Sequence, residues 1–348
     1  GNLSFLSFLN ISHNKFHGSL PFELAHLRRL KAMSMRVNYI SGEIPSTLGM
    51  LQELQHLDVG YNSLTGSIPL AIFNMSSLQF MRLRNNDLTG NLPDNLCNGI
   101  KSITEITLLN NHLTGDIPVN LESCRNLQIL SLGDNNLTGK IPDSIGELST
   151  LEELYLYGNQ LTGNIPSTLF NVSSLWMISL WGNQLSGPLP SNLSSCRSLQ
   201  KLYLSNNALS GQIPEGIGML PLIQVLDLTG NHFTGNIPST LFNVSSLWMI
   251  SLWGNQLSGP LPSNLSSCRS LQILVLYSNA LSGQIPEGIG MLPLIQVLDL
   301  TGNHLTGSIP LAIFNMSSLQ FMRLRNNDLT GNLPYNLCSG TKSITEII

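Results

Sequence analysis

Two short segments carry closely spaced arginines that could bind an anion. They are the Arg-x-Arg pairs Arg82 with Arg84 and Arg323 with Arg325. If each pair lies in a β-strand, both guanidinium groups leave the same face about 6 to 7 Å apart. That spacing suits a carboxylate or sulfate held by charge-assisted hydrogen bonds. The alternative interpretation is a pair of solvated charges without a ligand.

Six aromatic residues in repeats 7 to 12 of the chain form another candidate surface. They occupy two recurring positions of a repeated pattern: Tyr155, Tyr157, Trp181, Tyr203, Trp253 and Tyr277. On adjacent strands about 4.8 Å apart they would cover roughly 25 Å. Exposed aromatic residues are typical of partner-binding surfaces, so we predict that these six and the four arginines bind a ligand. The alternative is that the rings stack along a sheet and stiffen it.

No group of residues in the sequence is typical of an enzyme. His13 and His17 lie four residues apart but not in a predicted helix, and the other histidines lack neighbouring metal ligands. There is no nucleophile elbow, no CxxC and no phosphate-binding glycine loop. We therefore expect a non-enzyme without cofactor or metal. A net charge of −4 gives no basic surface for nucleic acid, so the expected partner is a peptide or protein.

A repeat positions these residues. Residues 151–166 show it as LxxLxLxxNxLTGxIP, and its asparagine recurs almost every 24 residues: Asn14, Asn38, Asn62, Asn86, Asn111, Asn135, Asn159, Asn183, Asn207, Asn231, Asn255, Asn279, Asn303 and Asn327. The alternating leucines predict a short strand with one buried face. No unit can bury that face alone, so neighbouring units must stack. We expect one domain over residues 1–348, with about 14 repeats of 24–25 residues, uncapped at both ends as in a fragment.

The pattern LxxLxLxxNxL(S/T)GxIP closely resembles the plant-specific leucine-rich repeat. Segments such as IPLAIFNMSSLQ and LPDNLCNGIKSI resemble ectodomains of plant leucine-rich-repeat receptor kinases of the pattern-recognition type. The resemblance implies an α/β fold: a right-handed solenoid with a concave parallel sheet, short second strands near GxIP, and 3₁₀ turns on the convex side. The Arg-x-Arg pairs resemble those with which some peptide-hormone receptors of this family hold a peptide's C-terminus.

The resemblance also implies a function. We expect an extracellular ectodomain of a plant cell-surface receptor that binds a peptide or protein on its concave sheet, with a leucine-rich-repeat co-receptor as a further partner. One alternative is a secreted inhibitor similar to polygalacturonase-inhibiting proteins. Another is a structural scaffold that associates end to end through its uncapped ends; an ice-binding array is disfavoured by Arg and Trp on the sheet.

Long blocks of the sequence are nearly identical. Residues 163–232 recur as 235–304, with differences only at Lys201/Ile273, Tyr203/Val275, Ser205/Tyr277 and Asn206/Ser278. Residues 66–106 recur as 307–347 with three differences. In the first block, three of the four changes fall at predicted outward positions of a strand, where recognition would diversify. Recent duplication and deliberate assembly would both give such blocks.

Cysteines and glycosylation motifs indicate the secretory pathway. Cys97 and Cys124 lie in successive turns, and a disulfide between them is plausible in an oxidising compartment; Cys196 and Cys268 are expected to be small core residues. The partner of Cys338 would lie beyond Ile348. Nine Asn-x-Ser/Thr motifs predict glycosylation at Asn2, Asn10, Asn74, Asn136, Asn171, Asn192, Asn243, Asn264 and Asn315.

Overall fold

The LxxLxL segment of almost every repeat forms a three-residue strand, and strands of successive repeats pair in parallel. The computed structural model describes residues 3–193, 195–332 and 344–348, and the chain divides into two compact units, residues 1–175 and 176–348. The long sheet of the first unit is built in chain order from β1 (Phe8–Asn10), β3 (Ala32–Ser34), β5 (His56–Asp58), β7 (Phe80–Arg82), β9 (Glu105–Thr107), β11 (Ile129–Ser131) and β12 (Glu153–Tyr155).

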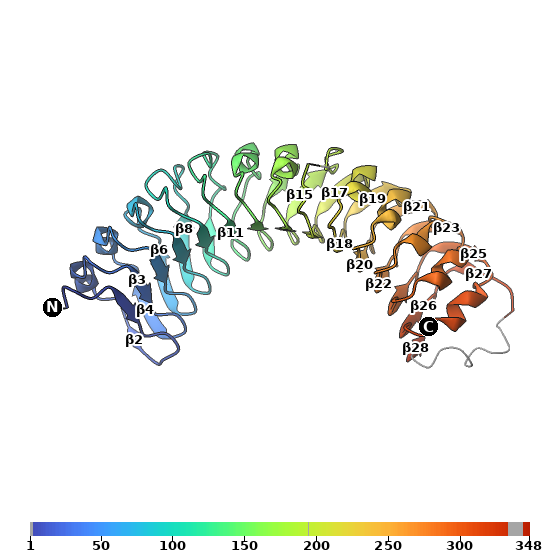
Figure 1. The fold of residues 1–348 in the computed structure, drawn as a ribbon, viewed down its shortest axis with the longest axis horizontal. Coiled ribbons are helices and arrows are strands. Elements are labelled where there is room, and N and C mark those ends of the chain that lie inside the picture. Colours follow the sequence, from blue (N-terminus) through green and yellow to red (C-terminus); the bar gives the residue numbers. More distant parts are fainter. Residues whose placement is uncertain (1–2, 194, 333–343) are drawn as a thin grey trace. The chain divides into compact units, whose positions relative to one another are not determined.

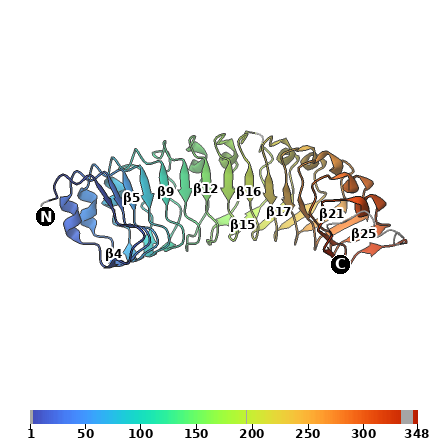
Figure 2. The ribbon, with the colours of Figure 1, turned by 60° about the horizontal axis from the view of Figure 1, so that its bottom comes forward.

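The second unit repeats this arrangement. Its long sheet contains β14 (Met177–Ser179), β16 (Lys201–Tyr203), β18 (Val225–Asp227), β20 (Met249–Ser251), β22 (Ile273–Val275), β24 (Val297–Asp299), β26 (Phe321–Arg323) and β28 (Glu346–Ile347). In each unit these strands lie side by side on the inner, concave side of the stacked repeats (Figures 1 and 2).

Leucine alternation decides which face of each strand is buried. Leu130 and Leu154 are paired in register across β11 and β12, and both are fully buried. Their strand neighbours Ser131 and Tyr155, also paired in register, point to the opposite face, as a period of two requires. The repeated leucines therefore form a continuous core behind each sheet. On the opposite face, side chains at the same position of successive strands form a row.

The repeated asparagine locks each repeat to the one before it. The Asn135 side chain donates to the carbonyls of Leu108 (3.1 Å) and Leu132 (3.1 Å), and its Oδ1 accepts from the Leu113 amide (3.0 Å). These backbone groups are buried where the chain leaves the sheet, so they need partners inside the protein. The same three kinds of bond recur around Asn111; the two that reach the preceding repeat span one residue more, and the one within the repeat keeps its offset. The extra residue of that repeat therefore lies outside this junction.

A second, shorter set of parallel strands follows the asparagine in each repeat. In the first unit these strands are β2 (His17–Gly18), β4 (Tyr39–Glu43), β6 (Ser63–Ser67), β8 (Asp87–Asn91), β10 (His112–Thr114) and β13 (Thr162–Gly163). In the second they are β15 (Gln184–Gly187), β17 (Ala208–Gln212), β19 (His232–Gly235), β21 (Gln256–Pro260), β23 (Ala280–Gln284), β25 (His304–Gly307) and β27 (Asp328–Leu329). Their glycines are needed: Gly66 has a φ of +73°, and a Cβ there would lie 2.9 Å from Glu43 Cγ.

Short 3₁₀ helices carry the chain back on the outer side of each unit. Most begin directly after a proline, whose fixed φ suits the start of a helical turn. They are η1 (Phe22–His26), η2 (Ser46–Met50), η3 (Ile72–Asn74), η4 (Asp143–Glu147) and η5 (Ser167–Asn171), then η6 (Glu215–Met219), η7 (Ser239–Asn243), η8 (Leu265–Ser267), η9 (Glu287–Met291) and η10 (Leu311–Asn315). The predicted solenoid with a concave parallel sheet, second strands near GxIP and 3₁₀ turns is thus confirmed.

Within the described ranges, no helix has the length and apolar character that a membrane crossing requires.

Candidate functional site

The outward face of each long sheet carries three rows of side chains, one more than the two predicted from the sequence. The two predicted rows flank the last buried leucine of each strand, as Tyr155 and Tyr157 flank Leu156. The third row is the first residue of each strand, which includes Glu105 in β9 and Glu153 in β12. The same alternation that predicted two rows also predicts this one. The carboxylates of this row place negative charges beside the predicted arginines and aromatic residues.

Arg82 is paired within the protein. Its Nε lies 2.7 Å from Glu105 Oε1 and its Nη2 lies 2.5 Å from Oε2, a two-point ion pair across neighbouring strands. Partial burial alone would raise the pKa of Glu105, but the hydrogen bonds and charge of Arg82 outweigh it, so this pKa lies below its ordinary value. The Arg82 guanidinium also lies 5.1 Å from the Phe80 ring centroid. A ligand carboxylate at Arg82 would therefore compete with Glu105.

Arg323 has the same kind of partner in the second unit. Its Nε lies 2.5 Å from Glu346 Oε1 and its Nη1 lies 3.6 Å from Asp299 Oδ2. Arg325 is exposed and lines a mostly apolar hollow of about 300 Å³ with Leu324 and the last two residues of the chain. In both Arg-x-Arg pairs, the first arginine is held by carboxylates of the protein, and among the described residues no ion pair involves the second.

A groove of about 250 Å³ lies on the sheet face of the first unit. It is lined by Arg84, Glu105, Thr107, Leu109, Ile129, Ser131, Glu153, Tyr155 and Tyr157. The two tyrosines meet edge to face with ring centroids 6.5 Å apart, and the Tyr155 hydroxyl donates to Glu153 Oε2 (2.6 Å). Partial burial raises the pKa of Tyr157, and the nearby Asp134 and Tyr61 raise it further. Three predicted residues, Arg84 and the two tyrosines, thus share one groove with carboxylates and hydroxyls.

The predicted aromatic residues of the second unit have different environments. Trp253 and Tyr277 stack with centroids 4.7 Å apart and an angle of 10° between their planes, the arrangement expected of rings that stiffen a sheet. Trp181 remains 37% exposed. Tyr203 is partly buried, which raises its pKa, and Asp227 raises it further.

A large hollow of the second unit lies away from its long sheet. It measures about 930 Å³ and is lined by the GxIP segments of successive repeats, among them Pro214, Pro238 and Pro262. A similar hollow of about 660 Å³ follows Pro142 in the first unit. The residues that line this groove recur in the repeats because the fold requires them. They therefore indicate a specific ligand less well than the variable side chains of the sheet face do.

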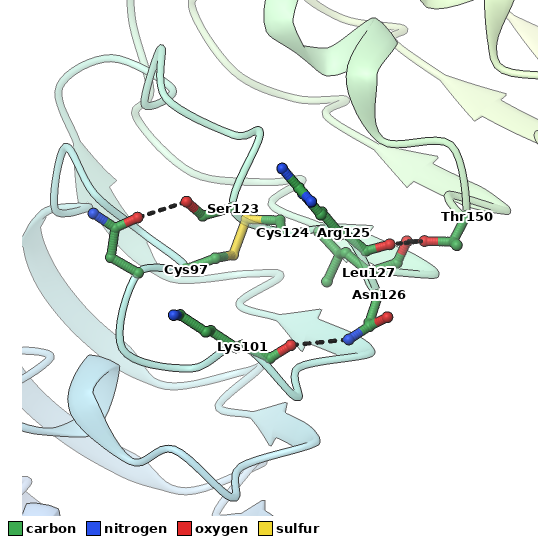
Figure 3. Close-up of a disulfide and its surroundings, with 9 residues drawn as sticks. Cys97, Lys101, Ser123, Cys124, Arg125, Asn126, Leu127 and Thr150 are labelled. Atoms are coloured by element: carbon green, nitrogen blue, oxygen red, sulfur yellow. Dashed lines mark hydrogen bonds between the residues drawn. A yellow bond between two sulfur atoms is a disulfide. The ribbon is translucent and has the colours of Figure 1, made fainter.

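Cys97 and Cys124 form a disulfide between successive turns on the outer side of the first unit (Figure 3). Their Cα atoms are 5.1 Å apart, and neighbouring turns are also joined by Ser123 Oγ, which donates to Asn98 Oδ1. Cys196 and Cys268 are buried thiols; burial raises the pKa of Cys196 to about 12 and that of Cys268 to about 11. Cys338 lies outside the described residues.

The glycosylation motifs lie mostly at exposed positions. Four of them are the last residue of a 3₁₀ helix, two in each unit: Asn74, Asn171, Asn243 and Asn315. Asn264 is less accessible, because its Nδ2 donates to the Ser239 carbonyl (2.9 Å) and to Asn243 Oδ1 (2.8 Å). The exposed Asn10 lies on β1, and the exposed Asn136 and Asn192 lie in loops. Asn2 lies outside the described residues. Occupancy of these sites stays a prediction.

In the described part of the chain, no group of three or more His, Cys, Asp or Glu residues is arranged to hold a metal ion. What the sheet faces offer is rigid, closely spaced polar and aromatic side chains. This arrangement suits recognition of an extended partner.

Comparisons with known proteins agree with this arrangement. One leucine-rich-repeat family model matches residues 101–161 and 173–233. A second matches residues 5–27, 53–75, 77–98, 270–292, 294–316 and 318–339. No curated protein sequence matches the chain.

Solved structures are similar over nearly the whole chain. The plant peptide hormone receptor RGFR1, solved in complex with RGF2, has 31% identity and a TM-score of 0.93 over 99% of this chain and 59% of that one. The ectodomain of GASSHO1/SCHENGEN3 from Arabidopsis thaliana, in complex with CASPARIAN STRIP INTEGRITY FACTOR 2, has 33% identity and a TM-score of 0.82 over 98% and 44%. The Arabidopsis receptor kinase HAESA, with the peptide hormone IDA and the co-receptor SERK1, has 27% identity and a TM-score of 0.56 over 98% and 74%. The chain spans about half the length of the first two.

Proposed function

Because the chain belongs to the leucine-rich-repeat family, we propose that it is a ligand-binding part of the ectodomain of a plant cell-surface receptor. It binds a peptide or protein on the outward face of its long sheets. The observation that carries this proposal is the groove in which Arg84 lies with Tyr155, Tyr157 and two glutamates on rigid strands. The similar peptide hormone receptor RGFR1 was solved in complex with RGF2, and HAESA was solved with the peptide hormone IDA, which supports a ligand of this class.

The sheet face suits a peptide for physical reasons. Short parallel strands hold their side chains in fixed rows, so little conformational entropy is lost when a ligand orders them. Tyrosine supplies a large contact area with only two rotatable torsions, and aromatic residues often dominate binding energy. Arg84, Glu105 and Glu153 supply both signs of charge and can set the direction of a bound chain. The proposed action is binding without chemistry.

Signal transmission requires a second protein in this proposal. A co-receptor carrying leucine-rich repeats is the partner we propose, since the similar HAESA structure contains the co-receptor SERK1. The exposed glycosylation motifs and the Cys97–Cys124 disulfide support an extracellular location, because such disulfides persist in oxidising compartments.

The experiment is a capture assay with matched variants. The wild-type chain is immobilised and exposed to peptides from plant extracellular fluid and to microbial extracts, and bound species are identified by mass spectrometry. A sheet-face variant carries Tyr155→Ala and Tyr157→Ala with Trp181→Ala. An outer-side variant carries Met219→Ala and Met291→Ala, which remove exposed apolar side chains without touching the sheet.

We expect a specific peptide or protein to bind the wild type and the outer-side variant, and the sheet-face variant to lose it. The captured species is then synthesised and titrated against all three chains. Equal capture by the sheet-face variant, with its circular dichroism spectrum unchanged, would refute binding on the sheet. Replacing Trp181→Ala together with Trp253→Ala tests the aromatic residues of the second unit in the same way.

A further inference from the structure

Two arginines from different repeats converge on one tyrosine ring in the first unit. Cζ of Arg36 lies 5.0 Å from the Tyr61 ring centroid, and Cζ of Arg84 lies 5.4 Å from it. The backbone explains this approach: the Val37 amide donates to the Gly60 carbonyl (3.0 Å), and the Tyr61 amide donates to the Arg84 carbonyl (2.8 Å). Arg36, Gly60 and Arg84 therefore occupy one outward row on three adjacent repeats.

Gly60 leaves room between the two arginines. A Cβ at Gly60 would lie 3.3 Å from Arg84 Cγ and 3.1 Å from the Arg84 carbonyl oxygen, so a larger residue would press on the stem of that side chain. The backbones of the first and third repeats are about 9 to 10 Å apart. Two arginine side chains leaning toward the middle can span that distance and leave space for one small group between their ends.

The Tyr61 backbone is in the left-handed region, with a φ of +55°. This conformation is unfavourable for a bulky residue and is a reason to look for a function. A positive φ recurs at this position in every repeat; the first three repeats place His13, Val37 and Tyr61 there, whereas most later ones have residues that tolerate it better, such as Gly158 and Asn206. Tyr61 is nevertheless 39% exposed, so burial of its ring in the core does not explain the choice. Its ring instead supports the two guanidinium groups.

The three arginines of this face differ in whether a carboxylate pairs with them. Arg82 is paired with Glu105, whereas in the described part of the chain no carboxylate lies within ion-pair distance of Arg36 or Arg84. Asp58 is another nearby carboxylate; its Oδ1 accepts a hydrogen bond from the Gly60 amide (3.1 Å). Nε of Arg36 is buried without an acceptor. Glu153 lines the groove with Arg84, so the three guanidinium groups face three carboxylates; the carboxylate that forms an ion pair, Glu105, is held by Arg82.

We propose that Arg36, Tyr61 and Arg84 form a subsite for an oxyanion, a carboxylate or sulfate, above Gly60. Stacking on an aromatic face uses the flat side of a guanidinium and leaves its N–H edges for an anion. Holding both arginines on one ring lowers the entropy lost on binding. In the cell, the anion would belong to the ligand, so its biological role rests on the proposed function. Arg84 also lines the groove described above, which places the subsite at the end of that groove.

The chain contains a natural control for this subsite. Residues 66–106 recur as 307–347, so Arg325 has the same local sequence as Arg84. The positions that correspond to Tyr61 and Arg36, one and two repeats earlier, are Gly302 and Tyr277. The second unit thus keeps one arginine of the subsite and lacks its ring and its second arginine.

The test uses small anions with the intact chain. Phenyl sulfate and benzoate are titrated separately at constant ionic strength, with benzamide as the neutral control, and binding is followed by saturation-transfer NMR. We expect saturable binding of at least one anion and none of benzamide; which anion binds identifies the oxyanion. Arg36→Gln and Arg84→Gln should each weaken binding about tenfold, the effect of losing one charge-assisted interaction of about 1.4 kcal/mol.

Two further variants separate the subsite from general effects. Tyr61→Asn should weaken binding while leaving the melting temperature equal or higher, because asparagine tolerates the left-handed backbone. Arg125→Gln, which changes an exposed arginine on the outer side of the first unit, should leave the dissociation constant unchanged. The proposal is overturned if neither anion binds saturably, if the substitutions of Arg36 and Arg84 have no effect, or if Arg125→Gln weakens binding equally.

Failure of this subsite is distinguishable from failure of the proposed function. If the anions bind as expected but the capture assay retrieves nothing dependent on the sheet face, the subsite stands and the receptor proposal fails. If a peptide is captured on the sheet while the anions do not bind, the receptor proposal stands and the subsite is wrong.

Discussion

The ring of Trp253 lies flat against that of Tyr277, with 4.7 Å between their centroids. Tyr277 is one of the four positions at which the block 235–304 differs from 163–232, and the earlier block has Ser205 there. The tryptophans are the same in both blocks, but only the later one has this tyrosine beside it. A single substitution therefore changes how much of an indole the sheet presents. For this pair, the structure favours ring stacking along the sheet.

Replacing Tyr277→Ser should expose Trp253. The stacked pair contributes about 0.5–1.5 kcal/mol beyond the area it buries, so the free energy of unfolding should fall by about 1 kcal/mol. Acrylamide quenching of tryptophan fluorescence should increase. Tyr277→Phe keeps the ring and should behave as the wild type in both measurements. Unchanged quenching in Tyr277→Ser would mean that the stack does not shield the indole in solution.

Asn135→Ala should be strongly destabilising, while Asn136→Ala next to it should not. The Asn135 side chain is buried and serves the Leu108 and Leu132 carbonyls and the Leu113 amide. Leaving buried groups without partners costs about 1–3 kcal/mol each, so we expect a loss of about 2–4 kcal/mol in urea unfolding. Asn136 is exposed and provides the matched control. Similar losses for both variants would contradict the structural role of the repeated asparagine.

Removing the disulfide with Cys97→Ala and Cys124→Ala should lower the free energy of unfolding. The bond joins residues 27 apart in sequence, and closing such a loop stabilises by about 3–4 kcal/mol in the chain-entropy model. Dithiothreitol should lower the unfolding midpoint of the wild type and have no effect on the double variant. The variant Cys196→Ala with Cys268→Ala should keep the response to dithiothreitol. If the unfolding midpoint of the fully reduced wild type equals that of the oxidised protein, the disulfide does not stabilise the fold.

His56 should make part of the stability depend on pH. Its pKa is lowered by partial burial and by the charge of Arg82, which Glu105 only partly offsets. When the pH falls below about 6.5, the ordinary histidine pKa, the unfolded chain takes up this proton first. The stability present above that pH is therefore lost as the pH falls toward the folded pKa.

Urea unfolding of the wild type and His56→Phe at about pH 7.5 and about pH 5.5 tests this. Phenylalanine keeps the stack with Phe80, in which the ring centroids are 4.4 Å apart. The wild type should lose more stability on acidification than the variant. Identical losses would show that His56 is not responsible.

Most of the fold could be predicted from the sequence because one unit fixes it many times over. The spacing of Leu154, Leu156 and Asn159 gives the strand, its buried face and the point where the chain turns. Glycine and proline in GxIP locate the second strand and the 3₁₀ turn. The same pattern in many aligned repeats fixes the position of each strand, whereas a single copy would leave it ambiguous.

Less of the site could be predicted. Sequence periodicity places Arg82 and Arg84 on one face, but it does not show that Glu105, 23 residues later in sequence, binds the first and leaves the second. It also does not show that Tyr61, just before the repeated asparagine, reaches two arginines. These relationships depend on side-chain rotamers and on which residues stand beside each other on adjacent strands. Only the parallel register of the assembled sheet supplies that information.

The asparagine bonds described above have an evolutionary consequence. In the 24-residue repeats, these asparagine hydrogen bonds join each repeat to the one before it at the same sequence offsets. Unequal recombination that inserts or deletes whole repeats therefore keeps all of these hydrogen bonds without compensating mutations. The copied blocks in this sequence are spaced by 72 residues in one case, three 24-residue repeats. A gene built this way can lengthen or shorten its binding surface in one genetic event, and then change its specificity by point mutations such as the one that separates Ser205 from Tyr277.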